Sequence, residues 1–196
     1  MNTPNKITLA RILLIPFIVF FYLANFIPWG QFIAGAIFVI ACFTDFLDGY
    51  LARKNNQVTT LGKFLDTIAD KILIMTALIL IIATPIANVN GVAQSIIRPE
   101  WFGIVCAILI LMREFAVSAL RQVAASKGVV LAAEKSGKVK AVFQFITLSL
   151  YFFYAFFVVE FYNGGLAVHK TANTVMAIIM LVLLGLTTIL TITSGL

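Results

Sequence analysis

All four aspartates of this chain lie between positions 45 and 70, and they fall into two pairs. Asp45 and Asp48 are three residues apart, and Asp66 and Asp70 are four apart, so in helices each pair shares a face. Carboxylates gathered in this way suit hard divalent cations such as Mg²⁺ or Mn²⁺. Two such ions can clamp the attacking and leaving oxygens of a phosphoryl-transfer reaction. The spacing predicts a two-metal site, provided that the surrounding elements bring the two pairs together.

The segments that carry these pairs are apolar enough to lie in a membrane. Of the 196 residues, 62% are hydrophobic and only 11% are charged, and the mean hydropathy is +1.06. A spanning helix needs about 20 mostly apolar residues, and the blocks that approach this length are 12–28, 31–50, 66–87, 101–125, 140–160 and 172–193. We therefore expect an all-α bundle of six transmembrane helices that forms one domain over residues 1–196. The Gly and Asn residues within 87–91 and 163–165 are expected to mark turns.

Basic residues are distributed unequally between the two ends of these blocks. With six spans, both termini share one side with the connections near 51–65 and 126–139, and twelve of the fourteen basic residues lie there. Only Arg98 and Lys170 lie on the other side. The positive-inside rule makes the first side cytoplasmic and the chain a multi-pass protein of the cell membrane. The formal net charge of +6 fits anionic membrane lipids and this topology, and no nucleic-acid partner is expected.

The two aspartate pairs are expected to meet at one depth, in the cytoplasmic half of the membrane. One pair ends the second block and the other begins the third, and the connection between them is short. An acidic residue at mid-membrane costs roughly 3 kcal/mol, and two carboxylates about 5 Å apart repel by about 3 kcal/mol. Bound divalent cations offset both costs best. An alternative, which explains the charge balance but not the facing pairs, is that the aspartates are helix-end charges paired with Arg53, Lys54, Lys63 and Lys71.

Residues around the aspartates resemble a known signature. The pattern Asp45-x2-Asp48-Gly49-x2-Ala52-Arg53-x8-Gly62-x3-Asp66-x3-Asp70 is similar to that of the CDP-alcohol phosphotransferases. The resemblance implies a six-helix, dimeric membrane fold. It also implies that the four aspartates hold two divalent metal ions, Mg²⁺ or Mn²⁺, against the diphosphate of a CDP-activated lipid, with the last aspartate as the general base.

Further residues are implied to contact the CDP-lipid. The segment 5–11 resembles the amino-terminal part that helps to hold the nucleotide in this family. Thr8 could alternatively cap a helix, and Gly49 and Gly62 could simply allow close helix packing. By resemblance, the contacts to the CDP-lipid come from Asn5, Thr8, Arg11, Thr44, Asp45, Asp48, Gly49, Ala52, Arg53, Gly62 and Asp66.

Segments 113–121 and 132–140 resemble the branch of the family whose acceptor is sn-glycerol 3-phosphate. The implied reaction transfers the phosphatidyl group of CDP-diacylglycerol to that acceptor and gives phosphatidylglycerol phosphate and CMP. A phosphorylated acceptor needs a cationic pocket. Glu114 is not expected to pair with its neighbour Arg113, because adjacent residues of a helix do not face each other. The lysines of the pocket could instead form a solvated loop that sets the topology. The candidate acceptor-binding residues are Arg113, Arg121, Lys135, Lys138 and Lys140.

Two other functions remain open. One is the same chemistry with another alcohol, such as serine, inositol phosphate or a second phospholipid, although the cationic residues argue against an uncharged acceptor. The other is a cation or proton transporter, because acidic residues within membranes commonly mark ion pathways. A transporter would distribute polar groups through the membrane depth, whereas here they gather at one level. Metal-dependent release of CMP distinguishes the two functions.

Overall fold

The computed structural model describes residues 3–24, 26–54, 60–83, 85–89, 92–127, 135–162 and 170–194. Within these ranges only the backbone is described for 3–6, 46–54, 60–61, 63–64, 85–89, 92–95, 135, 161–162 and 170–173. The helices of the described residues are α1 (Thr3–Leu23), α2 (Gly30–Lys54), α3 (Thr60–Ala83), α4 (Glu100–Ser126), α5 (Lys135–Phe157) and α6 (Lys170–Thr193). A short π-helix, η1 (Val158–Tyr162), continues α5.

Each apolar block of the sequence overlaps one of these helices, and α1 differs most from its block. It begins nine residues earlier, at Thr3, and ends at Leu23 instead of residue 28. Backbone hydrogen bonds continue through polar residues, so apolar composition marks only the part of a helix that can lie in lipid. After Leu23 the chain turns, with Trp29 at a positive φ of 64°, before α2 begins.

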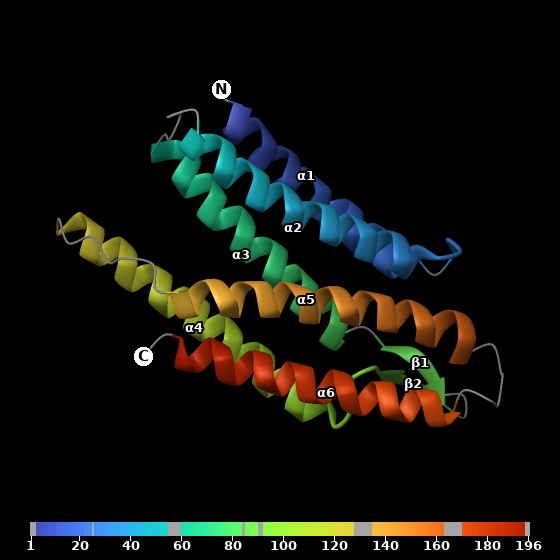
Figure 1. Cartoon of the computed structure of the whole chain (residues 1–196). Coiled ribbons are helices and arrows are strands. Elements are labelled where there is room, and N and C mark those ends of the chain that lie inside the picture. The colour runs from blue at the N-terminus through green and yellow to red at the C-terminus, as the bar shows by residue number, and fades with distance from the viewer. Residues whose placement is uncertain are drawn as a thin grey trace.

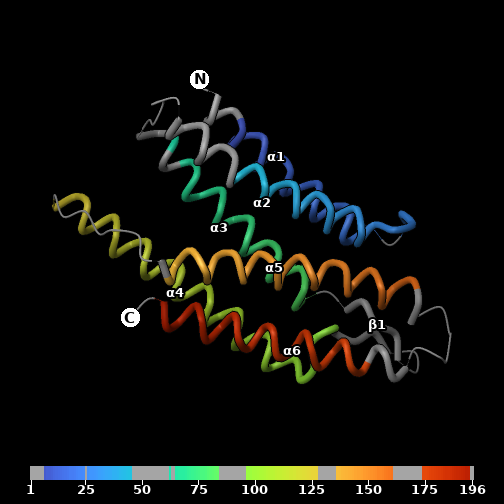
Figure 2. Tube along the Cα trace, in the orientation of Figure 1, coloured from blue at the N-terminus to red at the C-terminus, as the bar shows by residue number. Residues whose placement is uncertain are grey.

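Consecutive helices run in opposite directions along the bundle (Figure 1). α1 packs along α2, and α4 along α6, while α5 lies between the two pairs and contacts α2 and α6. α3 crosses from one group to the other, and it contacts α1, α4 and α5 (Figure 2). The ends of α2, α4 and α6 and the starts of α1, α3 and α5 therefore lie at the same end of the bundle.

A small antiparallel hairpin separates α3 from α4. Its strands are β1 (Pro85–Val89) and β2 (Val92–Ser95), in a register that pairs Val89 with Val92. The expectation of a turn at 87–91 is thus wrong for residues 87–89, which are in β1, while residues 90 and 91 lie outside the described part. The expected turn at 163–165 also lies outside it. An Asn-Gly pair followed by a β-branched residue is a hairpin signal, which apolar periodicity alone does not reveal.

Several helices are long and apolar enough to cross a membrane. Among the described residues these are Glu100–Ser126, Ser136–Glu160 and Thr174–Thr193, and two shorter apolar helices cover Ile7–Leu23 and Gly30–Asp45. The chain therefore has the character of a helical membrane protein. The charged residues of α3 all lie in its first half, and its second half, residues 72–83, is apolar apart from Thr76.

The contact between α2 and α5 depends on a small residue. The Phe152 ring of α5 stacks on Phe38 of α2, with centroids 5.1 Å apart, and meets Tyr22 of α1 edge-on at 5.3 Å. Gly35 of α2 faces Phe152 so closely that a Cβ atom at position 35 would lie 2.9 Å from the Phe152 Cβ. α5 can approach α2 this closely because position 35 carries no side chain.

We expect Gly35→Ala to destabilise the bundle by about 1–3 kcal/mol, the usual cost of overpacking a tight core. Thermal unfolding in detergent micelles measures this effect. Gly185→Ala is the matched control, since its Cβ would lie at an ordinary 3.5 Å from the Phe102 ring. Equal unfolding temperatures for the two variants would contradict the close approach at Gly35.

Candidate active site

Arg11 of α1 joins the two helices that carry the aspartates. Its Nη1 atom donates to Asp45 Oδ1 at 2.6 Å and to Asp66 Oδ1 at 3.3 Å. The Arg11 side chain is fully buried, whereas 29% of the Asp45 side chain and 49% of the Asp66 side chain are exposed. The two carboxylate oxygens can be no further apart than the sum of these two distances. α2 and α3 thus present one carboxylate each to a common point.

Asp70 lies one helical turn after Asp66, on the same face of α3. It is partly exposed, and its electrostatic neighbours are Asp66, Arg11, Lys140 and Lys71. The structure therefore gathers Asp45, Asp66 and Asp70 in one region. Asp48 lies in α2, three residues after Asp45, but its side chain is outside the described part.

The other residues expected at the CDP-lipid are placed to different extents. Thr8 is buried within α1, five positions after the start of the helix, so it does not act as a helix cap. The Thr44 hydroxyl donates to the Ala41 carbonyl oxygen at 2.7 Å, and its lone pairs remain available to accept. Gly62 lies in the first turn of α3. Other residues expected at the CDP-lipid lie where only the backbone is described. These residues are Asn5 in α1 and Gly49, Ala52 and Arg53 in α2.

A second polar cluster lies where α4, α5 and α6 meet. Lys140 is 95% buried and forms an ion pair with Glu114. Arg113 Nη1 lies 3.7 Å from the same carboxylate, and Arg113 Nη2 donates to the Ser194 hydroxyl at 2.8 Å. The expectation that Glu114 would not pair with Arg113 is wrong. The Glu114 carboxylate is the shared partner, since Arg113 of α4 and Lys140 of α5 both approach the same oxygen.

The five residues expected to bind the acceptor do not all belong to this cluster. Arg113 and Lys140 are in it, and Arg121, two turns further along α4, lies within electrostatic range of Arg113. Lys138 is exposed, which fits a solvated position better than a binding site. The Lys135 side chain is outside the described part. The cluster carries a net positive charge, since Arg113 and Lys140 outnumber Glu114, and Arg121 adds to it from nearby.

The two clusters approach each other through Asp70 and Lys140. Lys140 has both Arg113 and Asp70 as electrostatic neighbours. One end of the bundle therefore places a group of carboxylates within electrostatic range of a group of cations. Such an arrangement can hold a cation-bound diphosphate on one side and an anionic second substrate on the other.

Two residues of this region were not among the candidates from the sequence. Glu114 is the partner of Lys140, and an acidic residue within an apolar block is itself a signal of function. Gln144 follows Lys140 by one helical turn, is 99% buried, and has no hydrogen-bond partner for its amide nitrogen or oxygen among the described residues. Its spacing from Lys140 was visible in the sequence, but its burial was not.

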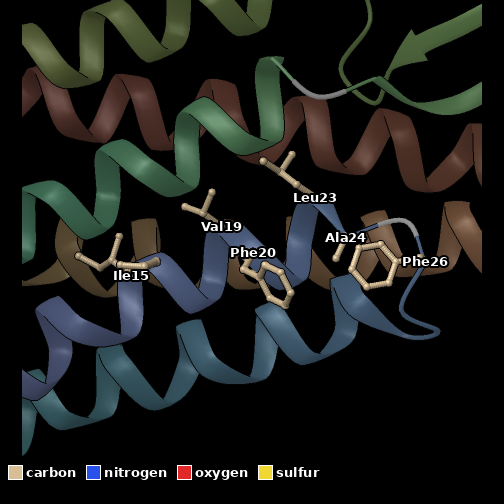
Figure 3. A pocket seen from close by; sticks show the side chains of 7 residues that line it. Ile15, Val19, Phe20, Leu23, Ala24 and Phe26 are labelled. Carbon is tan, nitrogen blue, oxygen red and sulfur yellow. The ribbon is translucent and has the colours of Figure 1, made fainter.

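An apolar pocket of about 590 Å³ lies along α1, away from the aspartates. Figure 3 shows its lining, which comes from α1 and the turn that follows it. The pocket begins at Ile15, one turn beyond Arg11, and ends at Phe26. Its side chains are all apolar, so it offers no group to a phosphate or a metal ion.

The carboxylates fit hard divalent cations. Asp45 and Asp66 already share one cationic partner, and oxygen ligands alone are what Mg²⁺ and Mn²⁺ prefer. Among the side chains that the structure describes, no three acidic, histidine or cysteine residues form a metal-binding group. Asp48, the fourth expected ligand, lies outside those side chains. Of the expected ligands, Asp45, Asp66 and Asp70 have described side chains, and Asp45 and Asp66 converge on Arg11 Nη1.

The chain belongs to the CDP-alcohol phosphatidyltransferase family, because the sequence model of that family matches residues 1–194. Similar curated proteins include the CDP-diacylglycerol–glycerol-3-phosphate 3-phosphatidyltransferases of Bacillus subtilis, 45% identical, Rickettsia felis, 39% identical, and Escherichia coli K12, 37% identical. Each match covers 76% of this chain, and the share of the relative is 75%, 74% and 75% respectively. The family and the class of enzyme predicted from the sequence are confirmed.

Proposed function

We propose that the protein transfers the phosphatidyl group of CDP-diacylglycerol to sn-glycerol 3-phosphate, giving phosphatidylglycerol phosphate and CMP. The observation that carries the acceptor assignment is that two cations, Arg113 and Lys140, share the single carboxylate of Glu114 in a cluster within electrostatic range of Asp70. Because Arg113 and Lys140 share the single carboxylate of Glu114, an uncharged acceptor such as serine would leave one positive charge of the cluster uncompensated, which is costly inside a membrane. The relatives named for glycerol 3-phosphate support the same acceptor.

The reaction breaks the bond between the lipid-bearing phosphorus and the CMP oxygen and forms a bond from that phosphorus to the acceptor oxygen. Asp70 acts as the general base and takes the proton of the attacking acceptor hydroxyl. Arg113, Arg121 and Lys140 bind the acceptor phosphate and hold the hydroxyl toward Asp70. Arg11, which reaches Asp45 and Asp66, is suited to the diphosphate, and we assign Arg53 of the sequence signature to the same group.

Asp45, Asp48, Asp66 and Asp70 would hold two divalent metal ions. When bound, the ions polarise the diphosphate and neutralise the charge that develops on the departing CMP oxygen. The convergence of Asp45 and Asp66 on one cation supports this assignment. Asn5, Thr8, Thr44, Gly49, Ala52 and Gly62 complete the CDP-lipid site in this proposal.

We also infer that six helices span the membrane as one domain, with both termini and the active site on the cytoplasmic side. The up-and-down arrangement supports this, because the aspartates, the cationic cluster and the two terminal helix ends lie at one end of the bundle. The excess of basic residues at that end fits the cytoplasmic surface. A homodimer is expected from the family and can be tested by the mass of the detergent-solubilised protein.

The decisive experiment is an assay of CMP release from CDP-diacylglycerol by purified protein in detergent micelles. Acceptors are glycerol 3-phosphate, glycerol, serine and inositol phosphate, each with Mg²⁺, with Mn²⁺ and with EDTA. Metal-dependent release with glycerol 3-phosphate alone supports the proposal. Release with another acceptor retains the chemistry and overturns the acceptor assignment. No release from folded protein with any acceptor would favour a cation transporter.

Lys140→Met is expected to raise the KM for glycerol 3-phosphate by about tenfold or more. This change corresponds to the binding free energy of one hydrogen bond to a charged group. The ammonium carries three donors, so it can pair with Glu114 and still donate to a phosphate. The KM for CDP-diacylglycerol should be unchanged. Lys138→Met is the matched control, because Lys138 is exposed two positions earlier on α5. Equal changes in the two variants would place the acceptor elsewhere.

A further inference from the structure

Gln144 is a buried polar group that the described residues of the bundle do not satisfy. Its side chain lies within the apolar span Ser136–Glu160, and it is only 1% exposed. Neither its Oε1 nor its Nε2 atom has a hydrogen-bond partner in the described part of the chain. A primary amide in such a place requires both a donor and an acceptor, which the described residues do not supply.

Its neighbours along α5 do find partners inside the bundle. Lys140, one turn earlier, pairs with Glu114 of α4. Thr147, three residues later, accepts a hydrogen bond at 3.0 Å from the Thr187 hydroxyl of α6, and Tyr151 donates to the Met180 carbonyl oxygen at 2.8 Å. Gln144 is therefore the exception on an otherwise satisfied polar stripe of α5. Because it is four residues from Lys140, the two side chains share one helix face.

The position of Gln144 matches the shape of the proposed acceptor. One helical turn separates it from Lys140 by about 6 Å along the axis, which a three-carbon chain can bridge. An acceptor phosphate at the level of Lys140 would place the carbon chain beside Gln144. In this orientation the reacting hydroxyl of the acceptor would face Asp70, which is an electrostatic neighbour of Lys140. The hydroxyl on the middle carbon can both donate and accept, as the Gln144 amide requires.

We propose that Gln144 is a positioning residue that hydrogen-bonds the non-reacting, middle hydroxyl of the three-carbon acceptor phosphate and thereby fixes which hydroxyl faces Asp70. This inference rests on the proposed function and deepens it. It assigns Gln144 to acceptor specificity, a role separate from binding the phosphate. Gln144 acts through the orientation of the acceptor and does not take part in proton transfer.

The test compares glycerol 3-phosphate with 1,3-propanediol monophosphate, which keeps the phosphate and a primary hydroxyl but lacks the middle hydroxyl. In the wild-type protein, kcat/KM should be at least about tenfold higher for glycerol 3-phosphate. In Gln144→Leu, which fills the same space without polar atoms, the ratio should fall to near one. The KM for CDP-diacylglycerol should stay the same.

Thr147→Val is the matched control, since this buried hydroxyl already has its partner on α6, and its ratio should equal that of the wild type. Gln144→Met serves as a second apolar variant if the first folds poorly. Each ratio compares the two acceptors with the same protein preparation, so a loss of folded protein does not change it. A wild-type ratio near one, or an undiminished ratio in folded Leu and Met variants, overturns the inference. Failure of the proposed function is distinguishable, because the wild-type protein would then release no CMP with glycerol 3-phosphate at all.

Discussion

Asp70→Asn should reduce CMP release by about a thousandfold or more, while the protein remains folded. A positioned general base contributes roughly 10²–10⁴-fold to a rate, and the variant also loses a charged ligand near the diphosphate. The amide is nearly the same size as the carboxylate, so packing on α3 changes little. The measurement is the initial rate of CMP release with saturating glycerol 3-phosphate and Mg²⁺, alongside thermal unfolding of the same preparation.

Glu100→Gln makes the same chemical change at the other end of the bundle, where α4 begins and the side chain is exposed. It should retain the wild-type rate. If Asp70→Asn kept a rate within tenfold of the wild type, Asp70 would not be the base, and a carboxylate of the other pair would have to take that role.

Arg11→Met should destabilise the metal-free protein by roughly 3 kcal/mol, the lower end of the cost of breaking a buried ion pair. The buried guanidinium is the shared cation of Asp45 and Asp66, and without it two carboxylates face each other uncompensated. The lower end applies because both carboxylates are partly exposed. Unfolding in detergent micelles with EDTA, followed by tryptophan fluorescence, measures the difference.

Divalent cations should restore part of this loss, since they neutralise the same carboxylates. Addition of Mn²⁺ is therefore expected to stabilise Arg11→Met by more than it stabilises the wild type. Arg121→Met, which removes an exposed arginine of α4, controls for the loss of a positive charge and should respond to Mn²⁺ as the wild type does. An equal Mn²⁺ effect in the wild type and Arg11→Met would show that Arg11 and the metal ions do not share the same carboxylates.

Much of this arrangement could be predicted from the sequence because it depends on local spacing. Apolar blocks located the helices, and the three- and four-residue intervals placed the aspartates on helix faces. The contacts that organise the site are long-range, and spacing does not encode them. Arg11 meets Asp45 and Asp66 across 34 and 55 positions of the chain. The pairing of Glu114 with Lys140 likewise depends on how α4 and α5 approach each other.

The contact of Gly35 with Phe152 has a consequence for substrate selection. α5 is a stiff rod, and Phe152 lies twelve residues, or about 18 Å, from Lys140. A sideways shift where α5 packs on α2 tilts the whole helix and moves the end that carries Lys140 relative to α3. The contact that sets how far Lys140 and Gln144 lie from Asp70 is thus about three helical turns away from Lys140 along α5. Acceptor preference can therefore depend on residues that no substrate touches.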